Sequence, residues 1–201
     1  MMDTLILPVL YSFLALFVIV DPFLGLAVFM SITKGMNRKE KFKQATIATG
    51  VALVLLLLFL FTGLIILGWL GITFGSFMVG GGIILLIMGV QAVLGIEFAK
   101  KGSKIKAAAV VIGTPLLTGP GAMTAVVILS NKYGYLPPAI GAVLVMIITF
   151  FMLAYSDKLH KLIGDRVVEV FSRVLGLLLV AIAVEIIKNG ITEMIHGFKF
   201  N

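Results

Sequence analysis

The sequence contains no cysteine and carries very little charge. The absence of cysteine excludes disulfide bonds, thiolate metal sites, cysteine nucleophiles and iron–sulfur clusters. Only 12% of the 201 residues are charged, whereas 61% are hydrophobic, and the mean hydropathy is +1.20. A water-soluble domain covers its surface with about 25% charged residues. A surface this poor in charge is expected to face lipid, so the sequence excludes an ordinary soluble domain.

Long uncharged runs predict membrane-spanning helices. A helical span needs about 20 apolar residues, whereas barrel strands form alternating segments of about ten. Residues 44–96 carry no charged side chain, which is enough for two spans with a turn near Trp69 to Gly75. The same reasoning predicts six spans: Leu5–Thr33, Phe42–Leu67, Phe74–Leu94, Ala107–Ser130, Leu136–Tyr155 and Val170–Ile191. We therefore expect an all-α, polytopic membrane protein with a single transmembrane domain over residues 1–201.

Basic residues gather on one side of the predicted membrane. The connectors after spans one, three and five hold 13 of the 16 Lys and Arg residues: Lys34, Arg38, Lys39, Lys41, Lys43, Lys100, Lys101, Lys104, Lys106, Lys158, Lys161, Arg166 and Arg173. The opposite side has Lys132 and Lys199, and Lys188 lies inside the last span. The positive-inside rule places both termini outside a cell membrane. Because no basic residue precedes the first apolar run, we expect that run to be retained rather than cleaved as a signal peptide.

The chain contains an internal repeat of three spans. Two residue pairs match at an offset of 98 and two at an offset of 94: Pro22 with Pro120, Lys34 with Lys132, Gly82 with Gly176, and Gln91 with Glu185. Repeat one covers about residues 1–98 and repeat two about residues 105–201. Since three is odd, the second repeat enters the membrane from the opposite face. Inverted repeats of this kind are characteristic of secondary transporters.

Proline and glycine interrupt spans one and four at matched positions. Asp21-Pro22 and Gly119-Pro120 each look like an N-cap followed by proline at the first helical position. Each span is then predicted to consist of two half-helices that meet near the membrane midplane. A proline that merely kinks a packed helix is the alternative for each site taken alone. The matched pair favours a transport site, because non-helical backbone at that depth must be buried in protein or line a cavity.

Four short motifs resemble the MarC/SnatA family of membrane proteins. They are V-D-P-F-x-G at Val20–Gly25, G-G-G-I-x-L at Gly80–Leu85, T-P-L-L-T-G-P-G at Thr114–Gly121 and R-V-L-G-L at Arg173–Leu177. The resemblance covers nearly the whole chain. It implies proton-coupled uptake of small neutral amino acids such as glycine and alanine, with serine and threonine as further candidates. Glu185 stands where the family more often has glutamine.

A zwitterionic substrate fits the chemistry of the two breaks. The half-helix starts at Phe23–Gly25 and Gly121–Met123 can offer amide donors to a carboxylate, and free carbonyls with Asp21 or Thr118 can accept from the ammonium group. Small residues leave room for a small ligand only. The predicted substrate-binding residues are Asp21, Pro22, Phe23, Gly25, Thr118, Gly119, Pro120 and Gly121. We expect a small neutral amino acid and the lipid bilayer as partners, no nucleic acid, no cofactor and no metal.

Three polar residues inside the spans are candidates for a coupling network. Asp21 is either an N-cap or a direct ligand, and the sequence leaves both open. Glu185 is followed at i+3 by Lys188, which favours a structural ion pair over a coupling role. Gln91 is more easily explained by a helix-to-helix hydrogen bond than by coupling.

Other functions are less well supported by the residues present. An intramembrane enzyme needs a nucleophile with a base in reach, and the two histidines, His160 and His196, lie at predicted membrane edges. An exporter or a channel-like permease for another small solute stays an alternative. Paired broken helices with few ionisable residues resemble a gated carrier more than an open pore.

Overall fold

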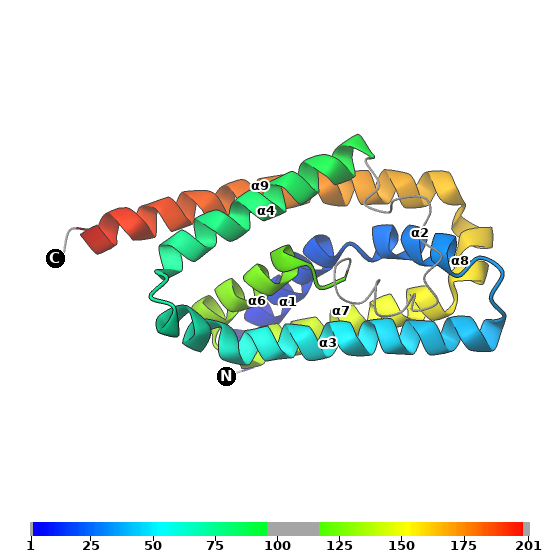
Figure 1. Cartoon of the computed structure of the whole chain (residues 1–201), viewed down its shortest axis with the longest axis horizontal. Helices are drawn as coiled ribbons and strands as arrows, with labels where there is room; N and C mark the ends of the chain where they lie inside the picture. The colour runs from blue at the N-terminus through cyan, green and yellow to red at the C-terminus, as the bar shows by residue number, and fades with distance from the viewer. Residues whose placement is uncertain (1, 96–116, 199–201) are drawn as a thin grey trace.

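The structure is a computed structural model that describes residues 2–95 and 117–198. Within these ranges the chain forms helices and no strands, which confirms the predicted all-α class. The helices, as labelled in Figure 1, are α1 (Met2–Val20), α2 (Pro22–Ile32), α3 (Arg38–Trp69), α4 (Phe74–Leu94), α6 (Pro120–Tyr133), α7 (Leu136–Ala154), α8 (Ser156–Ile163) and α9 (Asp165–Phe198).

The helix boundaries follow from local chemistry. Asn37 and Glu40 form a capping box at the start of α3, with reciprocal hydrogen bonds of 3.0 and 2.8 Å. Thr73 caps α4 by accepting from the Ser76 amide at 3.2 Å. The turn between α3 and α4 lies at residues 70–73, within the predicted stretch.

Among the described residues, five stretches are long and apolar enough to cross a membrane: Leu5–Ile32, Arg38–Trp69, Phe74–Leu94, Leu136–Ala154 and Arg166–His196. They correspond to predicted spans one, two, three, five and six. The second half of predicted span four is α6, and its first part, residues 107–116, lies outside the described residues. The structure therefore bears out a polytopic helical membrane protein, while the complete six-span inverted repeat stays a prediction.

The connector between the fifth and sixth spans differs from expectation. Residues 156–163 form the short helix α8, and α9 begins already at Asp165. Arg166 and Arg173, which the sequence placed in a connector, thus lie on α9. The predicted span Val170–Ile191 thus lies inside a longer helix, because a helix can continue past an apolar run as long as its backbone hydrogen bonds are satisfied.

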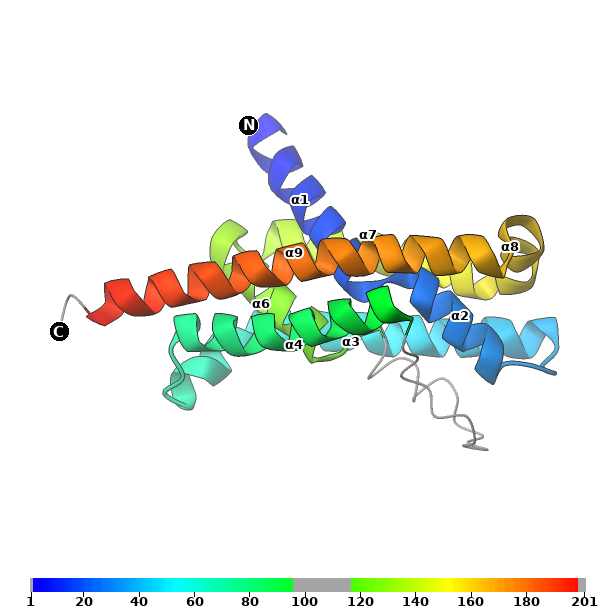
Figure 2. The same ribbon diagram turned by 90° about the horizontal axis from the view of Figure 1, so that it is seen from above.

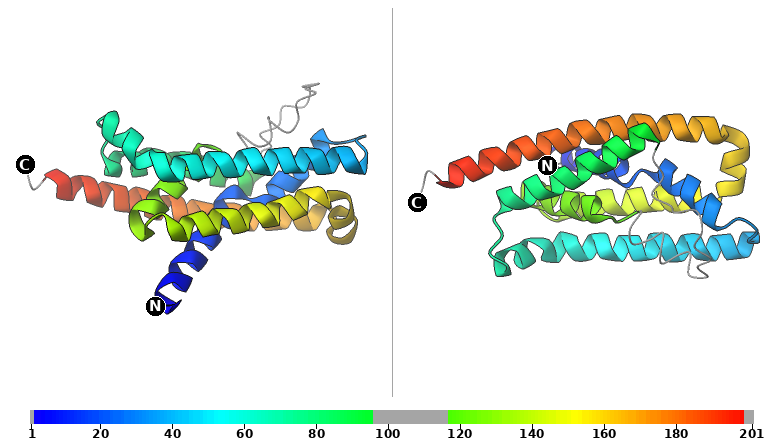
Figure 3. Two further views of the ribbon diagram at one scale, coloured as in Figure 1. Left: turned by 90° about the horizontal axis from the view of Figure 1, so that it is seen from below. Right: turned by 45° about the horizontal axis from the view of Figure 1, so that its top comes forward.

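The described helices form two groups. In one group, α4 and α9 run antiparallel and side by side along nearly the whole length of α4, as Figures 1 and 2 show. In the other group, α7 packs against α1 and α3, and α6 packs against α3 and α1 (Figure 3). The half-helix α2 contacts both α7 and α9, so it lies between the two groups.

Small residues bring α4 and α9 into close contact. Glycines recur every seven residues on α4, at Gly75, Gly82 and Gly89. A Cβ added to Gly75 or Gly89 would lie 2.9 Å from the carbonyl oxygen of Gly190 or Gly176, respectively. Without a hydrophobic driving force between helices in lipid, association depends on such close backbone approach.

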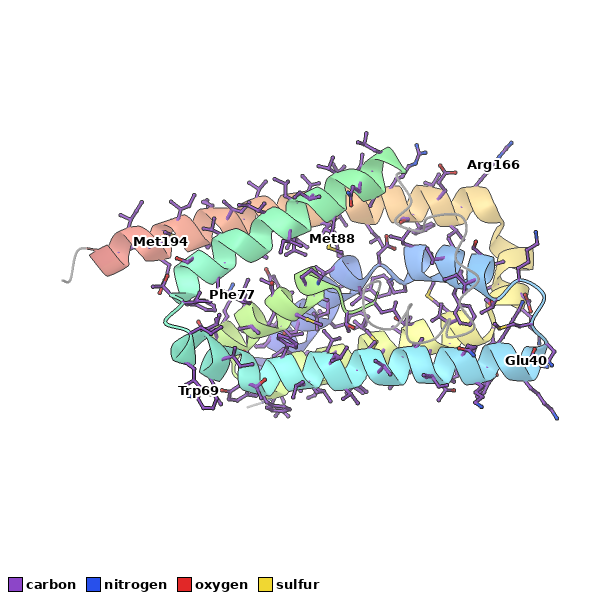
Figure 4. The ribbon with its side chains drawn as sticks, in the orientation of Figure 1. Glu40, Trp69, Phe77, Met88, Arg166 and Met194 are labelled. Carbon is purple, nitrogen blue, oxygen red and sulfur yellow. The ribbon has the colours of Figure 1, made fainter. Side chains whose placement is uncertain are left out.

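The outer surface of the helices is apolar, and the two ends of the molecule carry different residues. Large hydrophobic side chains stay exposed along the helices, including Leu7, Val54 and Leu177, as expected for a surface that faces lipid. Figure 4 places Glu40 and Arg166 at one end and Trp69 at the other. Two of the basic connectors therefore share one end of the molecule, and the start of α1 and the end of α9 lie away from that end (Figure 1).

Candidate functional site

The first helix break is built around Asp21. The residue has a left-handed backbone, with φ 43° and ψ 76°, between the last residue of α1 and Pro22 at the start of α2. Its Oδ1 accepts a hydrogen bond of 3.1 Å from the Leu24 amide. The predicted N-cap is thus confirmed. Aspartate is one of the few residues that adopt this conformation at modest cost, because its side chain can hydrogen-bond locally.

The second carboxylate oxygen of Asp21 is held by another helix. Ser172 of α9 donates to Asp21 Oδ2 at 2.5 Å, across 151 positions of sequence. Both residues are buried, with exposed fractions of 6% for Asp21 and 8% for Ser172. Sequence reasoning did not single out Ser172. Its available signal was a small polar residue in an apolar span, directly before the R-V-L-G-L motif.

The second break has the same proline but a different cap. Pro120 is the first residue of α6 and Gly119 is its N-cap, with an extended backbone at φ −60° and ψ 169°. The Gly119 carbonyl accepts from the amides of Ala122 at 2.9 Å and Met123 at 3.2 Å, and Gly119 makes no side-chain cap to the first turn. Thr118, directly before the break, is fully buried.

The fold brings the two breaks together. A Cβ on Gly25, in the first turn of α2, would lie 3.0 Å from Leu117 Cδ2, two residues before the cap of α6. The predicted substrate-binding residues of the two repeats, 98 positions apart in sequence, therefore lie on neighbouring segments at the centre of the molecule.

Side chains from α4 pack against the start of α6. A Cβ on Gly121 would lie 2.6 Å from Leu85 Cδ2 and 3.1 Å from Met88 Sδ. Leu85 and Leu117 are fully buried, and Figure 4 shows Met88 on the side of α4 that faces the first break. The space beside Gly25 and Gly121 is thus occupied by leucine and methionine side chains in this structure. Sequence reasoning did not identify these residues, since leucine in an apolar span carries no local signal.

Two of the predicted coupling residues lie elsewhere. Glu185 is 13 residues beyond Ser172 on α9, which is about 20 Å along the helix. Its side chain is 57% exposed and pairs with Lys188 at 2.7 Å, with Asn189 as a second partner at 3.3 Å. The ion pair expected from the i+3 spacing is present, and Glu185 is not brought to the breaks.

Gln91 is half-buried on α4, one turn beyond Met88. Its Oε1 is buried and has no hydrogen-bond partner among the described residues. The helix-to-helix hydrogen bond predicted for Gln91 is therefore not seen in that part of the chain.

Charge is scarce around the breaks. Arg173, next to Ser172, pairs with Glu169 at 2.5 Å, and both side chains are more than half exposed. The described residues contain no group of three His, Cys, Asp or Glu side chains that could hold a metal ion. In the described chain the site thus combines one buried carboxylate, two half-helix starts and apolar packing.

Comparison with known proteins identifies the family. Residues 7–195 match the family model described as MarC family integral membrane protein. The chain is 32% identical to a UPF0056 membrane protein of Archaeoglobus fulgidus, over 90% of this chain and 91% of the relative. It is also 32% identical to one of Methanocaldococcus jannaschii, over 90% and 94%, and 30% identical to one of Aquifex aeolicus, over 92% of each chain.

No solved structure matches the chain significantly. The family model nevertheless spans almost the full sequence, and the match agrees with the helical architecture and with the resemblance found in the motifs. The protein is an integral membrane protein that belongs to the MarC family.

Proposed function

We propose that the protein is a secondary transporter for small neutral amino acids, with its substrate site at the two helix breaks. One observation carries the proposal: half-helices starting at Pro22 and Pro120 converge, with Gly25 in contact with Leu117. Paired discontinuous helices at the membrane midplane are the recurrent binding element of transporters built from inverted repeats.

The two breaks differ in a way that suits a zwitterion. At α6 the N-cap is a glycine without a carboxylate of its own, so the positive dipole end of this helix is suited to a substrate carboxylate. At α2 the Asp21 carboxylate already caps the first turn, so a second anion is disfavoured at this helix start. A carboxylate has about four lone-pair positions, so Asp21 keeps acceptor capacity for the ammonium group.

The packing around the glycines supports a small substrate. Leu117 touches Gly25 and Leu85 touches Gly121, so a ligand reaches the breaks only when one of these leucines moves. Glycine and alanine demand the least movement, and serine adds a single hydroxyl. An additional charge, as in lysine or glutamate, has no partner among the described side chains around the breaks.

Direction and coupling are part of the same proposal. The protein lies in the cell membrane, with both termini outside and with the end that carries Glu40 and Arg166 inside, as the distribution of basic residues supports. Uptake driven by the proton gradient follows from the family resemblance, with Asp21 as the ionisable group at the site.

Counterflow in proteoliposomes tests the proposal. Vesicles preloaded with unlabelled alanine are diluted into a trace of labelled glycine, and a carrier accumulates the label transiently. An equal flux with and without internal alanine indicates a channel, and conversion of the label to another compound indicates an enzyme. Competition by leucine, lysine or glutamate at concentrations comparable to alanine contradicts the small-neutral assignment.

A further inference from the structure

The buried contact between Asp21 and Ser172 links two groups of helices. The carboxylate belongs to the break in the first span, and the hydroxyl belongs to α9, which packs along α4. The two residues are 151 positions apart, so neither local helix geometry nor the N-cap requires this contact.

An aromatic contact reinforces the same junction. Phe171, the neighbour of Ser172, stacks on Phe23 with ring centroids 5.0 Å apart and an interplanar angle of 20°. Two consecutive residues of α9 thus contact the break, Ser172 by a hydrogen bond to Asp21 and Phe171 by ring stacking on Phe23. The first turn of α2 is therefore attached to α9 as well as to its own cap.

The part of α9 that follows Ser172 is packed tightly on α4. Gly176 follows one turn later, where its Cβ position would be 2.7 Å from the Ala92 side chain and 3.1 Å from the Gly89 carbonyl oxygen. Backbones this close leave little freedom for α9 to slide along α4. Ser172 therefore joins the Asp21 carboxylate to a helix that is packed tightly on α4.

We propose that Ser172 is a positioning residue of the substrate site, which holds the Asp21 carboxylate in the orientation that receives the substrate ammonium group. The inference rests on the proposed function. In the described residues Oδ1 serves the Leu24 amide and Oδ2 serves Ser172, so the carboxylate has one orientation. Without the hydroxyl, Oδ2 loses that donor, and the carboxylate is then held through Oδ1 alone, by the Leu24 amide.

The test compares two serine variants in the counterflow assay. Ser172→Ala removes the hydroxyl at the junction. Ser130→Ala is the matched control, because Ser130 is buried and its hydroxyl donates to its own helix, at 2.9 Å from the Val127 carbonyl oxygen. A hydrogen bond to a charged group corresponds to about a tenfold change in affinity or more. We expect Ser172→Ala to raise KM for glycine about tenfold with Vmax within about twofold, and Ser130→Ala to leave KM unchanged.

Ser172→Thr keeps the hydroxyl and should restore most of the lost affinity. An unchanged KM in Ser172→Ala, an equal shift in Ser130→Ala, or a Ser172→Thr variant as weak as Ser172→Ala each overturns the positioning role.

Hydrogen exchange separates this inference from the proposed function. In protein reconstituted without substrate, the amides of the first turn of α2 should exchange faster in Ser172→Ala than in the wild type or in Ser130→Ala. If the wild type fails to show counterflow with any amino acid, the transport proposal fails, whatever the exchange result. If transport is present but exchange at α2 is the same in all three proteins, the positioning role fails alone.

Discussion

Single side chains at the breaks combine local and long-range roles. Asp21 caps its own half-helix through one oxygen and binds α9 through the other. It also has a positive φ, the only such non-glycine residue recorded in the described part of the chain. A non-glycine residue in this region persists only where its surroundings stabilise it. Substitutions at Asp21 therefore have to distinguish three contributions of the residue: its negative charge, its N-cap hydrogen bond and its left-handed backbone conformation.

Asp21→Asn is expected to abolish transport while the protein stays folded. Asparagine keeps an oxygen for the Leu24 amide and tolerates the left-handed backbone, but it lacks the negative charge that pairs with an ammonium group. The measurement is counterflow together with thermal unfolding in detergent.

Asp21→Ala is the companion variant, because it loses the cap as well as the charge. We expect it to lower the unfolding free energy by about 1–2 kcal/mol relative to Asp21→Asn. Near wild-type uptake by Asp21→Asn would show that the charge has no part in binding.

Gly121→Ala is expected to impair transport, and Leu85→Ala is expected to restore part of it. The new methyl would lie 2.6 Å from Leu85 Cδ2, which is closer than real Cβ contacts allow, and shortening Leu85 removes that atom. Initial rates of glycine counterflow in the two single variants and the double variant measure the compensation. If the double variant is no better than Gly121→Ala, the glycine is required by the backbone rather than by the leucine.

At the level of helices, proline and glycine act in two different ways. Prolines start half-helices at Pro22 and Pro120, whereas glycines on α4 and α9 allow two continuous helices to approach closely. The seven-residue spacing of these glycines also allows two alignments of the predicted repeats. Glycines of α4 match glycines of α9 at an offset of 101 (Gly75 with Gly176) as well as at 94 (Gly82 with Gly176). Glycine matches alone therefore do not determine the register between spans three and six.

Replacing Gly119 and Pro120 together by alanine is expected to abolish transport without loss of folded protein. Alanine favours a continuous helix, which would remove the helix start, and with it the positive dipole end, that the proposal assigns to the substrate carboxylate. Pro137→Ala is the control, because Pro137 lies in the first turn of α7 and interrupts no span. Normal counterflow by the double variant would show that the break at Gly119 and Pro120 is not required for transport.

The effect of a glycine-to-alanine substitution on stability should differ between the glycines of α4 that contact α9 and those that do not. Gly89→Ala places a methyl 2.9 Å from backbone atoms of α9, whereas Gly80→Ala finds nothing within 4 Å. We expect Gly89→Ala to lower the unfolding temperature. Gly80→Ala should leave it unchanged or raise it, because alanine in a helix is more favourable than glycine by about 0.5–1 kcal/mol. Equal shifts for the two variants would contradict the close α4–α9 contact.

At the scale of the whole molecule, polar contacts join helices at both ends. At one end Lys41 of α3 pairs with Asp157 of α8 at 2.5 Å, and Arg38 lies 6.0 Å from the centroid of the Tyr155 ring. At the other end Lys132 lies 5.3 Å from the centroid of the Tyr11 ring. Both ends therefore hold helices together by polar contacts, while the breaks lie between them.

Single-cysteine labelling tests the orientation, and the natural chain without cysteine is a suitable background. Arg38 and Trp69 begin and end α3, which has 32 residues and is about 48 Å long. A membrane-impermeant maleimide applied to intact cells should label Trp69→Cys and not Arg38→Cys. The reverse result would invert the topology proposed from the basic residues.

The sequence determined the membrane class, the approximate positions of the five described spans and the starts of α2 and α6, because hydropathy and proline act locally along the chain. The capping of α2 by Asp21 was likewise predictable, since the capped amide is three residues away. Its bond to Ser172, the packing of Leu85 on Gly121 and the α4–α9 pairing were decided by the tertiary structure alone. In lipid, apolar side chains are equally well solvated on every face of a helix. Hydropathy therefore does not indicate which faces meet, and only shape complementarity and buried hydrogen bonds select the partners.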